Sequence, residues 1–474
     1  MPPNIVSRRV PASALSTRVA TRLRVPAVLV AAVVRGARGS RQWLAVGGLL
    51  LVSPAAGAQR ITPAIGSPAG SATGSPGVHA ATDALEEQSA ARVAAAVCSK
   101  RVVLLGELPE HGEARGFGVK ARIVERLVAR CGFRAVLFEA GSYDFFGLKR
   151  ALAATQQAPA GPAARTDSLE LALARAIGGL WWTRELAGWR RWLVHEAVAG
   201  RVAIGGIDDQ PSATAAYARA TLPGLVGAAV PPVRAAECQE AVARYLGYTY
   251  TATLPYDSTE RARLADCTRL AADRAPAERT STARTAERRT PDEVMLGDLA
   301  SYFARERGAG EPGAAGTPDR DLVMAQNVAW WSARLSRDAK IVVWTATTHA
   351  ARAPDAPSVR PLGVPPLGER LAERWGDRLA VIGFTALRGQ WSRAGQPSQP
   401  LAPLPPQALE ARALAAGAAG DAAEWAYLDR AALRSLGSVP SRLFGKVTTT
   451  DWSTAFDGVL VIRDEVAPTV EPRR

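Results

Sequence analysis

The sequence is poor in cysteine, histidine and lysine, and it lacks a long apolar run. Its 474 residues include four Cys, four His and five Lys. No two cysteines form a Cys-x-x-Cys pair, which excludes zinc-ribbon spacing. The apolar stretches Val25–Val34 and Trp43–Val52 are each about half of the roughly 20 residues that a transmembrane helix needs. No Gly-x-Ser-x-Gly elbow, P-loop or Gly-rich nucleotide fingerprint occurs, so a serine-hydrolase mechanism and nucleotide binding have no support.

The composition is that of a globular protein, with 47% hydrophobic and 22% charged residues. The formal net charge of +14 is concentrated near the start of the chain. Residues 1–60 carry nine Arg and no acidic residue, and the rest of the chain has a surplus of only five positive charges. A nucleic-acid-binding surface would need basic residues gathered on one face, and we therefore expect no nucleic-acid partner.

The basic start of the chain has the order of residues typical of a secretory signal. Arg38 and Arg41 precede the apolar run Trp43–Val52, and the small residues Ala56-Gly57-Ala58 follow it. We predict a leader over residues 1–58, a flexible linker over 59–82, and a periplasmic or extracellular protein without stable membrane insertion after cleavage. An uncleaved anchor and a disordered basic tail are the alternatives.

Export would permit disulfides. Cys238 and Cys267 lie in two predicted helices on either side of a tyrosine-rich segment, so we predict a bridge between them. Cys98 and Cys131 each end a predicted helix, and their bridge is the second expectation. The alternative is that each cysteine is a small buried apolar residue.

Short apolar runs alternate with predicted helices along most of the chain. Runs without strict alternation suit strands that are buried on both faces, and intervening helices suit parallel crossovers. The predicted strands include 102–105, 135–138, 202–204, 341–344, 379–382 and 458–462. The sequence therefore predicts an α/β fold: a mostly parallel central sheet with helices on both faces, interrupted by a helical insertion at about 211–320. Four tryptophans at roughly helical spacing (Trp181, Trp182, Trp189 and Trp192) predict a core or groove-lining stripe on a helix over 180–198.

Acidic residues and imidazoles follow four of these strands. They are Glu107 and His111 after the first, Glu139 after the second, Asp208 after the third and His349 after the fourth. Ligands of parallel sheets gather beyond the carboxyl ends of the strands, so we expect these side chains to meet there. Each also has a structural interpretation, such as a helix cap, a turn residue or a surface histidine, and His195 within a helix favours packing or surface exposure.

Six segments in the same order resemble the erythromycin esterase-like family. They are VVLLGELPEHGEARGFGVKARIVERLVARCGFRAVLFEA from Val102, RVAIGGIDDQ, RDLVMAQNVAWW from Arg320, KIVVWTATTHA, PLGERLAERWGDRLAVIGFTALRGQW from Pro366 and FDGVLVIRDE from Phe456. The sequence departs from the family pattern twice. Glu107 and His111 are four residues apart where the family has three, and Ala346 and Thr347 stand where the family has its first His and its Asn.

The resemblance implies metal-free hydrolysis of a small-molecule ester or lactone, without a cofactor. It places function on Glu107, His111, Lys120, Glu139 and His349. A histidine can take a proton from water near neutral pH, and a carboxylate can fix its tautomer. We expect His111 to be this base, Lys120 or His349 to stabilise the oxyanion, and Asp208 and Trp344 to contact substrate. The alternative is a non-catalytic, metal-binding or haem-binding envelope protein on the same fold.

Overall fold

The computed structural model describes residues 76–109, 111–157, 162–212, 214–274, 287–308, 319–352, 364–393, 396–416 and 423–471. These residues all belong to one compact unit that begins at Ala72. The predicted leader over residues 1–58 lies outside the described residues, and so does the predicted linker up to residue 75.

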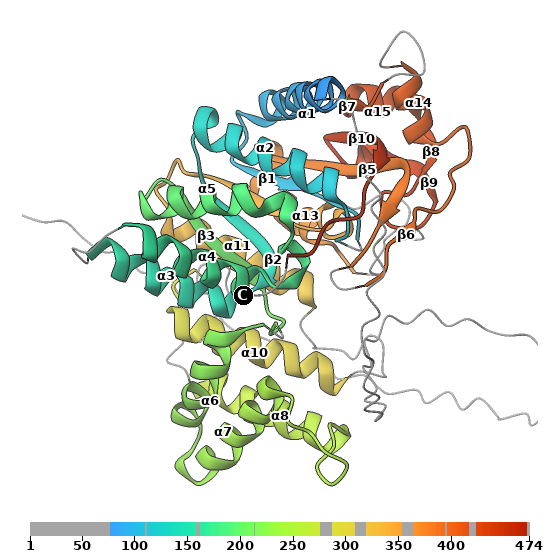
Figure 1. The fold of residues 1–474 in the computed structure, drawn as a ribbon. Coiled ribbons are helices and arrows are strands. Elements are labelled where there is room, and N and C mark those ends of the chain that lie inside the picture. The colour runs from blue at the N-terminus through green and yellow to red at the C-terminus, as the bar shows by residue number, and fades with distance from the viewer. Residues whose placement is uncertain are drawn as a thin grey trace, which may run out of the picture. The chain divides into compact units, whose positions relative to one another are not determined.

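A mixed, mostly parallel sheet forms the centre of this unit (Figure 1). Its strands are β1 (Val102–Leu105), β2 (Phe133–Gly141), β3 (Ala203–Asp208), β4 (Lys340–Trp344), β5 (Leu379–Trp391), β6 (Gln399–Pro400), β7 (Trp425–Asp429) and β10 (Gly458–Glu465). The order is β3-β2-β4-β1-β5-β10-β7, with β6 paired to β5. Pairing is parallel from β3 through β10, whereas β7 and β6 pair antiparallel. Strands β8 (Ser438–Ser441) and β9 (Thr448–Asp451) form a separate antiparallel pair.

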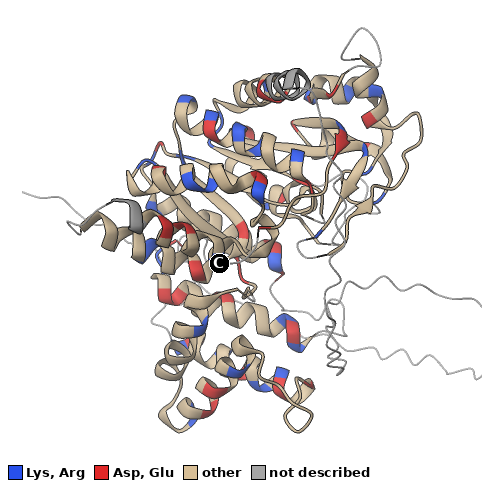
Figure 2. Cartoon of the chain, viewed as in Figure 1, with Lys and Arg blue, Asp and Glu red and all other residues tan. Residues whose placement is uncertain are grey.

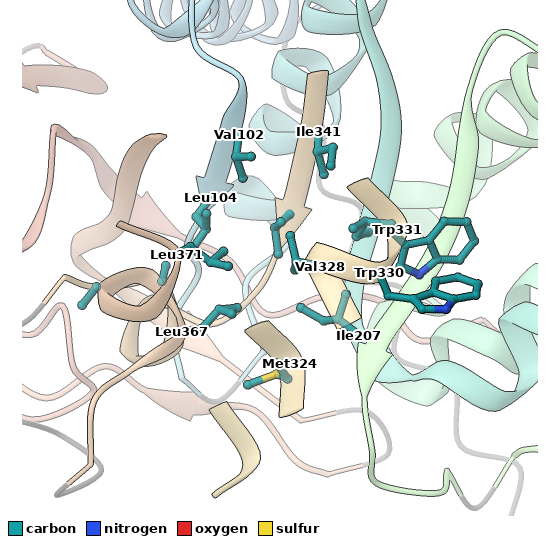
Figure 3. Packing of buried hydrophobic residues seen from close by; sticks show 14 of the residues in the cluster. Val102, Leu104, Ile207, Met324, Val328, Trp330, Trp331, Ile341, Leu367 and Leu371 are labelled. Carbon is teal, nitrogen blue, oxygen red and sulfur yellow. The ribbon is translucent and has the colours of Figure 1, made fainter. Parts of the chain in front are cut away.

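The sheet is buried on both faces because alternate side chains of each strand enter two different cores. Val102 and Leu104 of β1 join one apolar cluster, and Val103 and Leu105 join the other. Figure 3 shows the first cluster, where Val102 and Leu104 lie among residues of the neighbouring strand β4 and of the helices that cover this face. This double burial explains why the strands read as continuous apolar runs.

Helices cover both faces. On the face of Val103 lie residues of α1 (Pro76–Val97), α2 (Ala114–Cys131), α4 (Pro162–Ile177) and α5 (Ala187–Val198). The other face is covered by helices that include α11 (Arg320–Arg334), α13 (Leu367–Trp375) and α14 (Leu409–Ala416). Outside the insertion, the described residues also form α3 (Ser142–Gln157), α12 (Thr347–Ala350), α15 (Arg430–Leu436) and α16 (Trp452–Ala455), with short 3₁₀ turns η1 (Gly179–Trp181), η2 (Arg184–Leu186) and η4 (Gly376–Arg378). The predicted α/β fold with helices on both faces is confirmed.

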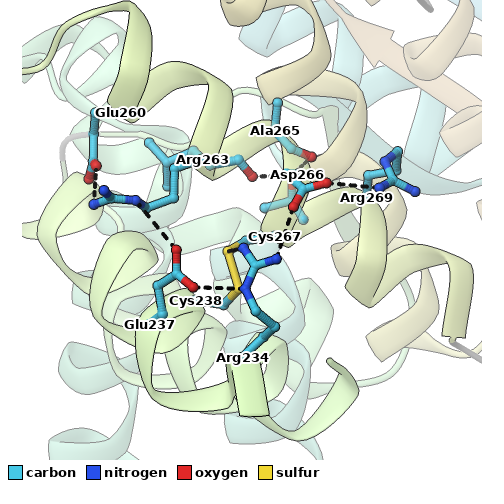
Figure 4. Close-up of a disulfide and its surroundings, with 11 residues drawn as sticks. Arg234, Glu237, Cys238, Glu260, Arg263, Ala265, Asp266, Cys267 and Arg269 are labelled. Atoms are coloured by element: carbon cyan, nitrogen blue, oxygen red, sulfur yellow. Dashed lines mark hydrogen bonds and ion pairs between the residues drawn. A yellow bond between two sulfur atoms is a disulfide. The ribbon is translucent and has the colours of Figure 1, made fainter. Parts of the chain in front are cut away.

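The predicted insertion is helical. It contains α6 (Ala216–Ala229), α7 (Pro232–Gly247), α8 (Ser258–Arg274) and α10 (Pro291–Arg307), which extend away from the sheet in Figure 1. Cys238 of α7 and Cys267 of α8 form a disulfide, and the acidic and basic side chains around it are paired (Figure 4). A second disulfide joins Cys98 to Cys131.

Three local expectations differ from the structure. Helix α1 begins at Pro76, within the linker predicted over 59–82. The edge strand β7 and the β8–β9 pair were not predicted, because their polar residues interrupt the apolar pattern. The predicted helix over 180–198 is regular only from Ala187, and Trp181 lies in η1. Charges of both signs are interspersed over the described elements (Figure 2), with no block of basic residues.

Candidate functional site

The predicted residues meet at the carboxyl ends of four adjacent strands. Glu107 and His111 lie in the loop after β1, Glu139 lies in the last part of β2, and Asp208 ends β3. His349 lies in α12, directly after β4. The strand order β3-β2-β4-β1 makes these segments neighbours, so the parallel topology alone gathers the side chains at one edge.

Glu107 is a fully buried carboxylate with four donors. Its Oε1 accepts from Nδ1 of His111 at 2.5 Å and from the indole N–H of Trp181 at 2.9 Å. Its Oε2 accepts from Nζ of Lys120 and from the indole N–H of Trp344, both at 2.6 Å. Burial alone would raise the pKa of Glu107, but Lys120 and His111 outweigh it and the pKa lies below its ordinary value. Glu107 is therefore anionic at neutral pH.

This carboxylate fixes the tautomer of His111. An ionised carboxylate can only accept, so Nδ1 of His111 carries a proton, and in the neutral ring the lone pair is then on Nε2. Nε2 points toward Glu139 and lies 3.9 Å from its Oε1. The His111 side chain keeps 14% of its surface exposed, whereas that of Glu107 has none. His111 is thus a partly exposed imidazole held by a buried carboxylate.

The extra residue between Glu107 and His111 does not separate them. The N–H of His111 donates to the carbonyl of Leu108 at 2.9 Å, which closes a tight turn. His111 has a φ of 53°, in the left-handed region that non-glycine residues seldom adopt. Such conformations persist where surrounding contacts enforce them, and they cluster at functional sites.

Glu139 lies between the two imidazoles. Its Oε1 is 3.2 Å from Nε2 of His349, and the same oxygen accepts from Arg320 at 2.9 Å. Its Oε2 accepts from the hydroxyl of Thr345 and from the backbone N–H of Ala346, both at 2.7 Å. Burial would raise the pKa of Glu139, but His349, Arg320 and His111 hold it far below its ordinary value. Ala346 therefore contributes to the site through its backbone N–H, although its side chain is not the imidazole of the family pattern.

His349 is held by a carboxylate on each side. Its Nδ1 lies 2.9 Å from Oδ1 of Asp321, opposite Glu139. Burial would lower the pKa of His349, but Glu139 and Asp321 raise it above its ordinary value. The two carboxylates therefore favour the protonated form of His349.

Arg320 brings a guanidinium cation to the site. It begins α11, and its guanidinium makes two hydrogen bonds to the carboxylate of Asp208, at 2.9 and 2.7 Å. Its Nη1 also lies 3.1 Å from Nε2 of His349. The Arg320 side chain is 31% exposed, more than His111 or His349. Asp208, predicted to contact substrate, is 6% exposed and instead orients Arg320.

Two further assignments need correction. Lys120, predicted as an oxyanion donor, is fully buried behind Glu107, with its ammonium 4.3 Å from the ring centre of Trp344. Trp344, predicted to contact substrate, is also fully buried. Both residues bind Glu107, and neither side chain is exposed to solvent.

Sequence reasoning missed three residues of the site. Arg320 and Asp321 stand in the segment RDLVMAQNVAWW, which was singled out without a role for either side chain. Trp181 was assigned to a helical stripe, but its place in η1 turns its indole toward Glu107. Among the described residues, no group of three or more His, Cys, Asp or Glu is placed to hold a metal ion. None of the described helices has the length and apolar character of a membrane span.

Comparisons with known proteins bear on the family and the fold. The sequence model of the erythromycin esterase family matches residues 128–465, a range that begins after Glu107, His111 and Lys120. No curated protein matches the chain.

Three solved structures share the fold. A protein from Bacillus cereus is 15% identical, with a TM-score of 0.56, covering 82% of this chain and 99% of that one. A succinoglycan biosynthesis protein is 15% identical, with a TM-score of 0.55, over 80% and 92%. A histidine-to-asparagine mutant of the erythromycin esterase EreC, in its open conformation, is 16% identical, with a TM-score of 0.54, over 79% and 93%.

Proposed function

This chain belongs to the erythromycin esterase family, and on that premise we propose that it hydrolyses a small-molecule carboxylic ester or lactone with water activated by His111. The observation that carries the proposal is the Glu107–His111 contact of 2.5 Å, which leaves Nε2 of His111 free to accept a proton. The cations of Arg320 and His349 lie close by, because Oε1 of Glu139 contacts both of them and lies 3.9 Å from Nε2 of His111.

The proposed reaction has two steps. Nε2 of His111 takes a proton from water while the water oxygen attacks the ester carbonyl, and Glu107 stabilises the imidazolium that forms. Arg320 and His349 stabilise the negative charge on the carbonyl oxygen. The imidazolium of His111 then returns its proton to the alkoxide oxygen as the acyl–oxygen bond breaks. The products are a carboxylic acid and an alcohol, which stay in one molecule when the substrate is a lactone.

The experiment is mass spectrometry of simple esters, lactones and erythromycin after incubation with the purified protein. Opening a lactone adds the mass of one water, and cleaving an ester gives an acid and an alcohol. We expect turnover of at least one compound, and equal turnover with EDTA because every group in the proposed reaction is a side chain. If no compound in the panel reacts, the proposal is contradicted and a binding role on this fold is favoured.

We also propose that the protein is exported after cleavage near Ala58. The sequence of the leader supports this, and so do the two disulfides, since oxidised pairs persist mainly outside the cytoplasm. N-terminal sequencing of the protein from its native host tests the proposal. A mature chain that keeps residues upstream of Arg41 would overturn it.

A further inference from the structure

The segment after β10 contacts both elements that hold the Glu107–His111 pair. We call residues 466–471 the C-terminal strap. In Figure 1 the dark red chain after β10 runs back toward the green elements. The strap lies beyond residue 465, where the match to the family ends.

The first contact of the strap is with the start of α2, just after His111. The carbonyl of Val466 accepts from the N–H of Ala114 at 2.8 Å. The preceding carboxylate of Glu465 accepts from the N–H groups of Arg115 and Gly116, at 2.7 and 3.1 Å. These bonds occupy donors that the first turn of a helix leaves without intrahelical partners. The strap therefore fixes the point where the chain leaves His111 and enters α2.

The second contact is with the segment that carries Trp181. The N–H of Arg184 donates to the carbonyl of Thr469 at 2.8 Å, and the N–H of Glu471 donates to the carbonyl of Trp182 at 3.2 Å. Between them, Thr183 and Val470 form an antiparallel bridge. The strap thus pairs with residues 182–184 much as a short edge strand would.

A buried cation locks this second contact. Arg190 of α5 is fully buried, and its Nη1 donates to the carbonyls of Trp181 and Thr183, at 3.2 and 2.8 Å. Its Nη2 binds the carboxylate of Glu471. Removing the partner of a buried charge is costly, so Glu471 keeps Arg190 in the position from which it holds the backbone of Trp181.

Trp181 connects the Glu471–Arg190 contact to His111. Its indole N–H donates to Oε1 of Glu107, the same oxygen that accepts from His111. Its ring also meets the His111 ring edge-on, with 5.5 Å between centroids. A shift of residues 181–184 would therefore loosen the hydrogen bond to Glu107 and the wall beside His111 together.

We propose that Glu471 and Arg190 are positioning residues for His111, acting through Trp181 and Glu107. The proposal rests on the proposed function, in which His111 is the base. Neither residue touches the reacting atoms. The strap contributes by keeping His111 and Glu107 in fixed positions relative to each other.

The first arm of the test needs no substrate. Hydrogen exchange of the indole N–H groups is followed by NMR in the full chain labelled with ¹⁵N-tryptophan, and the resonances are assigned with Trp181→Phe and Trp344→Phe. Both indoles donate to Glu107, but Trp344 comes from β4, whereas the hydrogen bonds of the strap described above go to α2, to residues 182–184 and to Arg190. In Glu471→Gln we expect the exchange of Trp181 to rise roughly tenfold, the usual effect of losing a hydrogen bond to a charged group, while Trp344 is unchanged.

The second arm measures turnover of p-nitrophenyl acetate, or of the best ester from the panel, in a double-mutant cycle. We expect Glu471→Gln to lower kcat roughly 10- to 100-fold, since misplacing a catalytic group by about 1 Å can cost 100-fold, with little change in KM. In a Trp181→Phe background the same substitution should have little further effect on kcat, because the hydrogen bond between residue 181 and Glu107 is already lost. Asp464→Asn is the matched control. The Asp464 side chain, on β10, pairs with the exposed Arg388 of β5, and we expect wild-type kcat.

The proposal is overturned if the indole N–H of Trp181 exchanges at the wild-type rate in Glu471→Gln. It is also overturned if the fall in kcat of the double variant equals the product of the falls in the two single variants. A variant that loses activity only by partial unfolding would speed the exchange of Trp181 and Trp344 alike, which also contradicts a positioning role. If the wild-type protein hydrolyses nothing, the proposed function fails, and the exchange measurement still decides whether Glu471 holds Trp181 in place.

Discussion

Nδ1 of His111 and Oε1 of Glu107 lie 2.5 Å apart, although the two residues are one position farther apart in the sequence than the family pattern has them. The turn at Leu108 and the left-handed backbone of His111 absorb the additional residue. The pair therefore keeps the arrangement that general-base chemistry requires, a carboxylate on one ring nitrogen and a free lone pair on the other. The predictions below follow from this pair and from the charges that surround it.

Replacing Lys120 should destabilise the protein through Glu107. Lys120→Met leaves a fully buried carboxylate without its cation, and breaking one partner of such a pair costs about 3–5 kcal/mol. Urea unfolding measures the loss. The double variant Lys120→Met/Glu107→Gln should recover part of it, because no uncompensated charge remains. A single variant as stable as wild type would show that Glu107 does not depend on Lys120.

Replacing Glu139 should change both turnover and the titration of His349. Glu139→Gln keeps the volume of the side chain but removes the charge that Arg320 and His349 share. We expect kcat to fall about 100-fold or more, because the oxyanion donors lose their anchor. NMR titration should show a lower pKa for His349, since Glu139 raises it in the wild type. An unchanged His349 titration would contradict the assignment.

The stability contributed by His349 should depend on pH. Its pKa is raised in the folded protein, so His349 stabilises the fold while it is protonated. This contribution is complete below the unfolded-state pKa of about 6.5 and is lost as the pH rises through the folded-state value. The difference in free energy of unfolding between wild type and His349→Gln should therefore shrink as the pH increases above about 6.5. His195→Gln, at a side chain that is 72% exposed, is the control. A difference between wild type and His349→Gln that grew with pH would contradict the prediction.

All four cysteines should be oxidised. Thiol counting on denatured, unreduced protein should find no free thiol, because Cys98 pairs with Cys131 and Cys238 with Cys267. The second bridge joins residues 29 positions apart, so replacing both of its cysteines with serine should lower the free energy of unfolding by roughly 3–4 kcal/mol. Four free thiols would refute both bridges.

The sequence allowed the sheet and the placement of the site to be predicted for one physical reason. Parallel strands buried on both faces read as apolar runs, and their carboxyl ends meet at one edge, so Glu107, Glu139 and His349 could be brought together without coordinates. The edge strand β7 escaped prediction because it pairs antiparallel and carries polar residues.

The roles of individual side chains were harder to predict, because they depend on direction and burial. Lys120 falls on the buried side of α2, and its ammonium points to the back of Glu107. Arg320 reaches the site from the first residue of a helix that follows the insertion, and no spacing in the sequence indicates that reach. Trp181 reaches Glu107 because the chain forms a 3₁₀ turn at this position, before α5 begins, and not the helix predicted over 180–198.

The most direct test of the account is the turnover of His111→Ala on a substrate that the wild-type protein hydrolyses. His111 holds Glu107 on its Nδ1 and is the more exposed imidazole of the described site, at 14% against 7% for His349. Losing a general base typically costs about 10²–10⁴-fold in rate, so we expect kcat/KM to fall within that range while His195→Ala stays near wild type. Wild-type turnover by His111→Ala, with the fold intact, would contradict the account and would leave His349 as the next candidate for the base.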